Sequence, residues 1–104
     1  MKIDLGKNEL IHFVGIGGIG MSGLALIMNE LGYKVQGSDI ADNRNIGRLK
    51  EKKIRVFIDH KKQNIKKTTV LVISSAIKKN NPEVAEAIRK NLPIYTRGDM
   101  LGHI

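Results

Sequence analysis

The chain has 104 residues, no cysteine and no tryptophan, and a formal net charge of +8 at pH 7. Its length suits one domain, residues 1–104, with a single core and too little chain for a second. The lack of cysteine excludes a disulfide framework and a cysteine-based zinc site. No apolar run approaches the length of a membrane span and the first residues are polar, so we expect a cytoplasmic protein that does not enter a membrane.

The positive charge suggests nucleic acid or an acidic surface as a partner. The lysines, however, fall in pairs within segments expected to be loops or exposed helix faces, and no aromatic residues lie between them to stack on bases. We therefore interpret them as solvated faces and expect no nucleic-acid partner, although a basic domain that binds nucleic acid stays open as an alternative. The pairs are Lys52-Lys53, Lys61-Lys62, Lys66-Lys67 and Lys78-Lys79.

The first segment is expected to form a strand, a tight turn and a helix. Residues 10–14 are apolar and β-prone, the motif Gly15-x-Gly17-x-x-Gly20 follows directly, and apolar residues at helical spacing continue over residues 19–31. In a phosphate-binding βα unit the first glycine makes the turn, the second lets the backbone approach a diphosphate, and the third lets the helix pack on the strand. The helix N-terminus offers unpaired N–H groups and about half a positive charge. The segment therefore predicts an anion site.

A second strand, residues 33–39, ends in Asp39, about twenty residues after Gly20. An acid at this place can accept hydrogen bonds from the hydroxyls of a ribose whose phosphates lie on the glycine-rich loop. The glycine motif alone is a weak signal, but together with Asp39 it favours a nucleotide site over a simple connection. On these residues alone, NAD and other nucleotides fit equally well.

The rest of the chain alternates between helical and extended patterns. Residues 68–73 form an almost uninterrupted apolar and β-branched run, which is typical of a strand covered on both faces. Asn81 and Pro82 are an expected N-cap and first helical position. The further expected elements are a polar loop at 41–45, a helix at 46–53, a strand at 54–58, a loop with one helical turn at 61–67, a helix from 82 to about 91, a strand at 93–96 and a helix from 97.

This alternation predicts an α/β fold, namely a Rossmann-like, doubly wound parallel sheet of about five strands in the order 3-2-1-4-5, with helices on both faces. Ligands bind such a sheet at the carboxyl ends of its strands, where the strand order reverses. Polar side chains follow the second, third and fourth strands at this edge: Asp39, His60 and the pair Ser74-Ser75. The loop and these side chains should therefore meet at one site.

The histidines and serines also have ordinary structural explanations. An imidazole at His60 can contact a base, and on physical grounds this is as well supported as a surface histidine. His12, inside the first strand, and His103, near the end of the chain, are interpreted as structural. The hydroxyls of Ser74 and Ser75 suit a phosphate or sugar, but serine is common where a strand enters a turn. Neither lies in a G-x-S-x-G context, so a hydrolase nucleophile is not expected.

Three segments resemble the amino-terminal domain of the MurC-type Mur ligases, the UDP-N-acetylmuramate:L-alanine ligases of peptidoglycan synthesis. Residues 11–25 contain Gly-Ile-Gly-Gly-Ile-Gly-Met-Ser-Gly, residues 37–39 are Gly-Ser-Asp, and residues 74–83 contain Ser-Ser-Ala-Ile followed by Asn-Pro-Glu. The resemblance covers nearly the whole chain. Its Met21-Ser22 and Ser-Ser-Ala-Ile segments favour this ligase over the related murein tripeptide ligase.

The resemblance implies a domain that binds the UDP part of UDP-N-acetylmuramate within a longer, three-domain, ATP-dependent enzyme that forms an acyl phosphate. A central domain would bind ATP and Mg²⁺ and a third would bind the amino acid. This chain is then expected to hold no cofactor or metal, to be inactive alone, and to have the UDP sugar and the remaining ligase domains as partners. The site residues that the resemblance implies are Gly15, Gly17, Gly18, Ile19, Gly20, Met21 and Ser22 near the diphosphate, Asp39 and His60 at the uridine, and Ser74 and Ser75 lining the cleft.

The chain departs from the family pattern at two places. The family usually has glycine where Lys53 precedes the third strand, and Gly-His where this chain has Asp59-His60. This chain also contains no G-x-x-x-x-G-K-[ST] segment that would bind the phosphates of ATP. It stops just before the family's ATP loop is expected, as an excised domain would. Two other hypotheses stay open: a stand-alone NAD-binding regulatory module and the basic nucleic-acid-binding domain.

Overall fold

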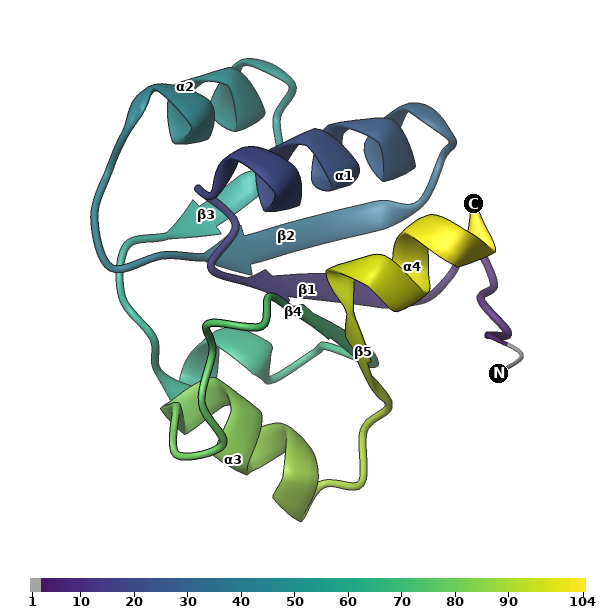
Figure 1. Ribbon diagram of the computed structural model, residues 1–104, viewed down its shortest axis with the longest axis vertical. Coiled ribbons are helices and arrows are strands. Elements are labelled where there is room, and N and C mark those ends of the chain that lie inside the picture. Colours follow the sequence, from purple (N-terminus) through teal and green to yellow (C-terminus); the bar gives the residue numbers. More distant parts are fainter. Residues whose placement is uncertain (1–2) are drawn as a thin grey trace.

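A five-stranded parallel sheet forms the centre of the fold (Figure 1). The structure is a computed structural model that describes residues 3–104. The strand order is β3-β2-β1-β4-β5, and every neighbouring pair is parallel, which confirms the predicted α/β fold and topology. The elements are β1 (Leu10–Val14), α1 (Ile19–Glu30), β2 (Lys34–Ser38), α2 (Arg44–Glu51), β3 (Arg55–Phe57), the 3₁₀ helix η1 (Lys62–Ile65), β4 (Val70–Ile73), α3 (Pro82–Arg89), β5 (Ile94–Thr96) and α4 (Arg97–His103).

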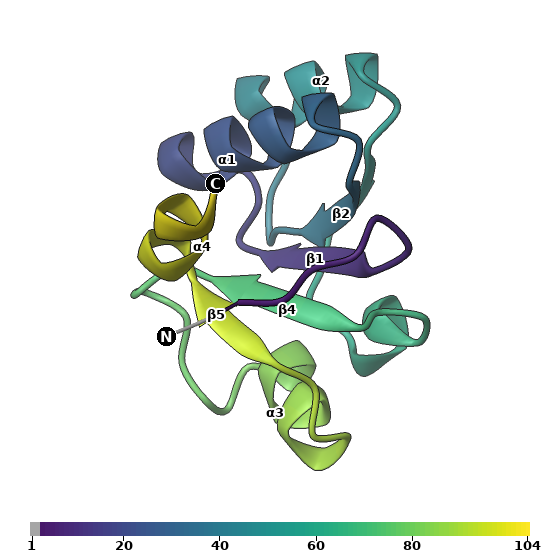
Figure 2. The same ribbon diagram turned by 90° about the vertical axis from the view of Figure 1, so that its right-hand side faces the viewer.

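Helices cover both faces of the sheet (Figure 2). On one face, Leu24 of α1, Leu49 of α2 and Met100 of α4 are buried in one hydrophobic cluster. On the other, Ile65 of η1 and Val84 of α3 belong to a second cluster. Two covered faces explain why the strands read as nearly continuous apolar runs. None of the helices within residues 3–104 is both long and apolar enough to cross a membrane.

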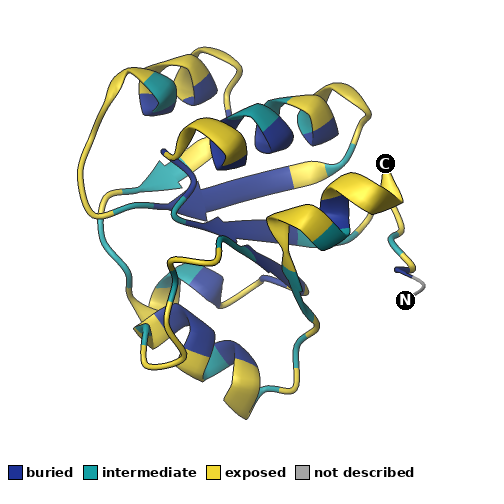
Figure 3. Cartoon of the chain, viewed as in Figure 1, coloured by how far each residue is buried: buried dark blue, intermediate teal, exposed yellow. Residues whose placement is uncertain are grey.

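Three polar side chains break the apolar character of the central strands, which Figure 3 shows as buried. His12 of β1 and Ser38 of β2 are 0% exposed, and Gln36 of β2 is 7% exposed. His12 alternates along β1 with Ile11 and Phe13, which lie in the α1 cluster, so His12 faces the α3 side of the sheet. Polar groups buried there need hydrogen-bond partners, and these shape the site described below.

Helix α2 begins at Arg44, two residues before the predicted start at 46. The Asn43 side chain is the reason, because its Oδ1 accepts the backbone N–H of Ile46 at 2.9 Å and so caps the helix. The last residues of the predicted polar loop, 41–45, therefore form the N-cap and the first turn of this helix. The strand expected at 54–58 is also shorter, at Arg55–Phe57.

Helices α1, α2 and α3 end in the same way, each with a residue of positive φ after the last turn. These residues are Gly32 (φ 95°), Lys53 (φ 64°) and Asn91 (φ 59°). After α2, Lys53 N–H donates to Lys50 O at 2.9 Å and Ile54 N–H to Leu49 O at 3.0 Å, the paired bonds of a Schellman motif. Lys53, the lysine found where the resembling family has glycine, therefore keeps the backbone conformation that favours glycine.

Candidate functional site

The loops after β1, β2, β3 and β4 meet at the carboxyl edge of the sheet, as the topology predicts (Figure 1). The N–H groups of Gly15 and Ile16 both donate to the carbonyl of Ser38, at 2.8 and 3.0 Å, and so fix the glycine-rich loop to the end of β2. Gly15 has a φ of +85°, which an L side chain rarely adopts. It makes the sharp turn that the motif predicts.

Gly17 packs against Asp39 and α2. Its N–H donates to Asp39 Oδ2 at 2.8 Å, and a Cβ at this position would lie 2.6 Å from the same oxygen. Its carbonyl accepts from Nδ2 of Asn43 at 3.2 Å and of Asn45 at 2.9 Å. Gly17 therefore makes room for the carboxylate, to which its N–H is bonded. The approach of its backbone to a diphosphate stays a prediction.

Asp39 holds the glycine-rich loop in place and still has free hydrogen-bond acceptor positions for a ligand. Its second oxygen, Oδ1, accepts the N–H of Ile40 at 2.8 Å, and the residue is partly exposed. Each carboxylate oxygen has two lone-pair sites, so two bonds leave acceptor positions on the exposed side. The acid that the sequence places near the loop therefore lies against it.

The N-terminus of α1 has no side-chain cap, unlike the other α-helices within residues 3–104. Its N-cap is Gly18, and its first turn contains no acidic residue. The first N–H to bond within the helix is that of Ser22, to Gly18 O at 2.8 Å. The N–H groups of residues 19–21 thus precede the internal ladder and carry the positive end of the helix dipole. The capping residues of α2, α3 and α4 are Asn43, Asn81 and Thr96.

The side chains of this turn point in different directions. Ile19 is 87% exposed, whereas Met21 and Ser22 are buried at 3% and 5%. The Ser22 hydroxyl donates to Ile19 O at 3.2 Å. Of the predicted diphosphate contacts, Met21 can therefore offer only its backbone, and Ser22 has its hydroxyl hydrogen bonded within the helix.

Arg97, which the sequence reasoning missed, lies against Gly20. A Cβ on Gly20 would be 2.9 Å from Arg97 Nε and 3.1 Å from Cζ. Gly20 therefore makes room for a guanidinium, and its predicted role in packing the helix on the strand stays a prediction. Arg97 begins α4, directly after β5, and its place behind a strand end is the signal that could have found it. It brings positive charge to the N-terminus of α1.

His60 lies at the same edge but is largely enclosed, with 12% of its side chain exposed. Its Nδ1 is 2.8 Å from Ser38 Oγ. Ser38 is the residue before Asp39, so the two predicted uridine contacts are joined through the end of β2. On the far side of the glycine-rich loop, Ser74 is partly buried and Ser75 exposed, directly after β4.

A buried carboxylate, Glu83 of α3, is the centre of a hydrogen-bond network beneath His60. The sequence predicts only the start of a helix at this position. Its Oε1 accepts from His12 Nε2 at 2.7 Å and from Ser38 Oγ at 2.5 Å. Its Oε2 accepts from Asn64 Nδ2 at 2.7 Å and from the N–H of Lys61 at 3.2 Å.

The Glu83 carboxyl is 0% exposed, and its surroundings favour the ionised form. Burial alone raises its pKa, but the hydrogen bonds from His12, Ser38 and Asn64 outweigh burial and hold the pKa below its ordinary value. Four donors fill the acceptor positions of one carboxylate, which is how a buried charge is tolerated. The network ties β1, β2, the segment after β3 and α3 together at the site.

Comparison with known proteins assigns this arrangement to a family. The family model described as Mur ligase family, catalytic domain, matches residues 10–104. The chain belongs to the Mur ligase family. Together with the named relatives below, this match confirms the resemblance to MurC-type ligases found in the sequence.

The similarity extends to named Mur ligases. The UDP-N-acetylmuramate–L-alanine ligase of Pelagibacter ubique is 65% identical over 104 residues, which are all of this chain and 22% of that protein. The crystal structure of UDP-N-acetylmuramate-alanine ligase MurC from Thermotoga maritima has a TM-score of 0.84 and 35% identity, covering 88% of this chain and 21% of that one.

A second solved Mur ligase is similar at a lower identity. The UDP-N-acetylmuramate:L-alanyl-gamma-D-glutamyl-meso-diaminopimelate ligase from Neisseria meningitides has a TM-score of 0.83 at 29% identity, over 89% of this chain and 30% of that one. The chain therefore spans between a fifth and a third of the length of these three ligases.

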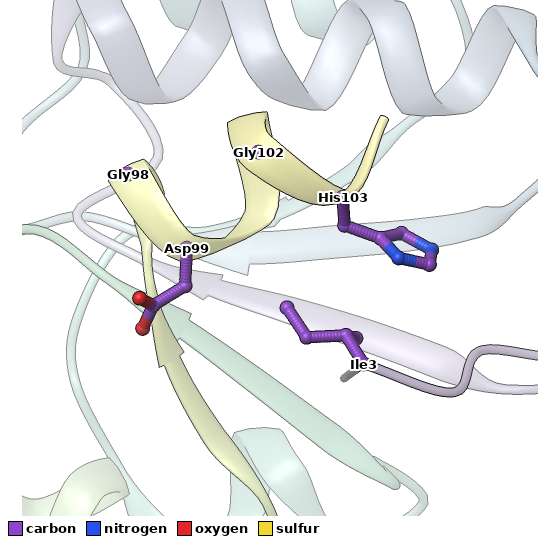
Figure 4. A pocket seen from close by; sticks show the side chains of 5 residues that line it. All are labelled: Ile3, Gly98, Asp99, Gly102 and His103. Atoms are coloured by element: carbon purple, nitrogen blue, oxygen red, sulfur yellow. The ribbon is translucent and has the colours of Figure 1, made fainter. Parts of the chain in front are cut away.

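A pocket elsewhere in this Mur ligase chain does not belong to the site. It lies beside α4 and is lined by Ile3, Gly98, Asp99, Gly102 and His103 (Figure 4), none of which is a predicted site residue. The Asp99 carboxylate is engaged there, because its Oδ2 accepts the N–H of Thr96 at 3.0 Å within the capping box of α4. The convergence at the carboxyl edge remains the candidate site.

Proposed function

We propose that this chain binds the UDP part of UDP-N-acetylmuramate, as a domain of a ligase that joins L-alanine to that nucleotide sugar in peptidoglycan precursor synthesis. The proposal rests on one observation: the uncapped N-terminus of α1 lies at the same sheet edge as Asp39 and His60. The relatives named as UDP-N-acetylmuramate–L-alanine ligases support this choice of nucleotide sugar.

Each part of the site suits one part of a uridine nucleotide. The N–H groups of residues 19–21 offer donors to the diphosphate, and the Arg97 guanidinium beside Gly20 adds positive charge. Asp39 offers carboxylate oxygens to the ribose hydroxyls. His60, beyond Asp39 on the β3 side, contacts the base, and Ser74 with Ser75 lines the opposite side of the loop.

We expect the ligation itself to require further domains of the longer ligase. ATP and Mg²⁺ would act in another domain of the longer ligase, and within residues 3–104 no group of three or more His, Asp or Glu residues could hold a metal ion. We expect the 104-residue chain to show neither ATP hydrolysis nor alanine ligation when every substrate is supplied. Alanine-dependent phosphate release from the purified chain would contradict this.

NAD is the second candidate ligand, because a glycine-rich loop and an acid after the second strand also suit a dinucleotide. Isothermal titration of the chain with UDP, UDP-N-acetylmuramate, NAD and a DNA oligonucleotide separates the hypotheses. We expect the two uridine nucleotides to bind and the other two ligands not to bind. Binding of NAD alone would favour a regulatory module, and binding of the oligonucleotide alone would favour a basic nucleic-acid domain.

His60→Ala tests the assignment of the base. We expect it to weaken UDP binding by at least about tenfold, or 1.4 kcal/mol, while the melting temperature falls by only a few degrees, because Ser38 keeps its bond to Glu83. His103→Ala, which removes an exposed histidine at the end of α4, is the matched control and should bind UDP normally. Unchanged UDP affinity in folded His60→Ala protein would remove His60 from the site.

A further inference from the structure

The contacts along Glu83, Ser38 and His60 determine where the hydrogens lie. Ser38 Oγ is 2.5 Å from Glu83 Oε1 and 2.8 Å from His60 Nδ1. An ionised carboxylate carries no hydrogen, so the hydrogen of the first contact belongs to the Ser38 hydroxyl. A hydroxyl has one hydrogen only, and the second contact must therefore be donated by the imidazole. Neutral His60 is thus the Nδ1–H tautomer.

Contacts at the opposite end of the network determine the donor at the other bond to Glu83 Oε1. Gln36 Nε2 donates to the carbonyl of Asn64 at 2.9 Å, which places the amide nitrogen, not the oxygen, at that position. The same nitrogen donates to His12 Nδ1 at 2.8 Å, so His12 Nδ1 is an acceptor and its Nε2–H donates to Glu83 Oε1 at 2.7 Å. Oε1 therefore receives from His12 and from Ser38, and neither bond can reverse while Glu83 is ionised.

The remaining nitrogen of His60, Nε2, is open to solvent. Within residues 3–104, every buried side-chain nitrogen and oxygen has a hydrogen-bond partner. Nε2 of His60 has none in that part of the chain, so it is not a buried atom. Nε2 therefore contributes to the 12% of the side chain that is exposed, and a ligand can reach it. In the Nδ1–H tautomer this atom carries a lone pair and can only accept a hydrogen bond.

We propose that Glu83 and Ser38 are positioning residues that set the tautomer of His60, so that Nε2 accepts the N3–H of a uracil base. This assignment rests on the proposed function for its ligand but not for the tautomer. Uracil presents two carbonyl oxygens and one ring N–H along its pairing edge, so only N3–H can donate to Nε2. If Nε2 carried the hydrogen instead, two donors, Nε2–H and N3–H, would face each other and no hydrogen bond could form between them.

The tautomer is measured first, without any ligand. ¹⁵N-histidine-labelled protein at about pH 8, above the ordinary histidine pKa of about 6.5, gives distinct nitrogen shifts for protonated and unprotonated ring nitrogens. We expect His60 to show protonated Nδ1 and unprotonated Nε2, the reverse of the form that free imidazole side chains favour. Protonated Nε2 in the wild-type chain would overturn the proposal directly.

Ser38→Ala then breaks the connection between Glu83 and His60. We expect its His60 to shift toward the Nε2–H form. The matched control is Thr68→Val, which removes a buried hydroxyl 3.4 Å from Gln36 Nε2, at the end of the network remote from His60. Thr68→Val should leave the His60 tautomer unchanged.

Binding of UDP and of N3-methyl-UDP tests the contact itself. The wild-type chain and Thr68→Val should bind UDP about tenfold more tightly than the methylated nucleotide, since one hydrogen bond is lost and Nε2 is left unpaired. In Ser38→Ala that preference should largely disappear, whereas a preference due to a steric clash with the methyl group would persist and would contradict the contact.

The two proposals fail in different ways. If UDP does not bind the wild-type chain, the proposed function and the base contact fail, while the NMR result still decides the tautomer. If UDP binds and N3-methyl-UDP binds equally well, the function stands and the uracil contact is wrong. If Ser38→Ala does not fold, the wild-type NMR spectrum and the nucleotide pair still support or overturn the proposal.

Discussion

The two halves of the candidate site are built by different means. The glycine half, residues 15–20 with Asp39, is made of backbone groups held by a short turn, and its helix N-terminus is open. The histidine half, consisting of Ser38, His60 and Glu83, is made of enclosed side chains joined by hydrogen bonds across 22 to 45 positions of sequence. The first half depends on local conformation, and the second depends on the packing of α3 against the sheet.

The largest effect should come from removing the centre of the histidine half. Glu83→Ala leaves buried donors of His12, Ser38 and Asn64 without an acceptor, and we expect the free energy of unfolding in urea to fall by about 3–5 kcal/mol. Glu86→Ala is the matched control, because it removes another glutamate of α3 whose partner is the exposed Arg89. A loss in Glu83→Ala no greater than in Glu86→Ala would show that the network does not stabilise the fold.

The pH dependence of stability sharpens the same comparison. The folded-state pKa of Glu83 is lowered, so ionised Glu83 adds stability that is fully present above its unfolded pKa of about 4.3 and is lost as the pH falls through the folded value. The titratable groups that face it, His12 at 2.7 Å and His60 at 3.7 Å, are retained in Glu83→Gln. We therefore expect wild type to exceed Glu83→Gln in unfolding free energy at neutral pH, and this difference to shrink below about pH 4. A difference independent of pH would contradict the assignment.

The contrast between the halves also explains what the sequence could predict. The strand order, the turn at Gly15 and the approach of Asp39 to the loop follow from patterns within a few residues and from the rules for parallel sheets. The role of Glu83 does not follow from such patterns, because a glutamate at the second position of a helix is an ordinary helix-start residue. Only the packing of α3 places it beneath Ser38.

Two glycines show the limit of motif reasoning within the glycine half itself. The spacing correctly indicates that Gly17 and Gly20 have close neighbours, and in the structure these include Asp39 and Arg97, which the motif alone does not identify. A glycine reports that an atom is near, and the sequence does not say which one. Arg97 was missed because nothing in its own segment connects it with α1.

Gly17→Ala should give the second largest effect, and on binding more than on stability. The added methyl group would meet Asp39 Oδ2 at 2.6 Å, so the carboxylate must move away from the loop and from a bound ribose. We expect UDP and UDP-N-acetylmuramate to bind at least about tenfold more weakly, or 1.4 kcal/mol, in a chain that still folds. Gly23→Ala is the control, because it lies in α1 beyond the predicted diphosphate contacts and a Cβ there has no neighbour within 4 Å outside the backbone of its own helix. Equal affinities in the two variants would place the nucleotide elsewhere.

Arg97→Gln should have a smaller effect on the same half. The guanidinium adds charge beside the helix N-terminus but is exposed, so we expect UDP to bind about threefold to fivefold more weakly at low salt, with less difference at high salt. Arg89→Gln, which removes an exposed arginine on the other face of the sheet, should leave binding unchanged. A salt-independent loss would point to a change in the packing of α4.

The smallest effect concerns a backbone conformation outside both halves. Lys53 holds a φ of 64° at the end of α2, the helix that packs on Gly17. A left-handed residue with a side chain costs about 1–2 kcal/mol, whereas glycine costs about 0.5–1 kcal/mol through the entropy of the unfolded chain. We therefore expect Lys53→Gly to raise the unfolding free energy in urea by about 0.5 kcal/mol without changing UDP affinity.

Asn91→Gly, at φ 59° after α3, should gain less stability, because asparagine tolerates this conformation better than lysine. If the asparagine variant gained as much as the lysine variant, relief of side-chain strain would not be the cause.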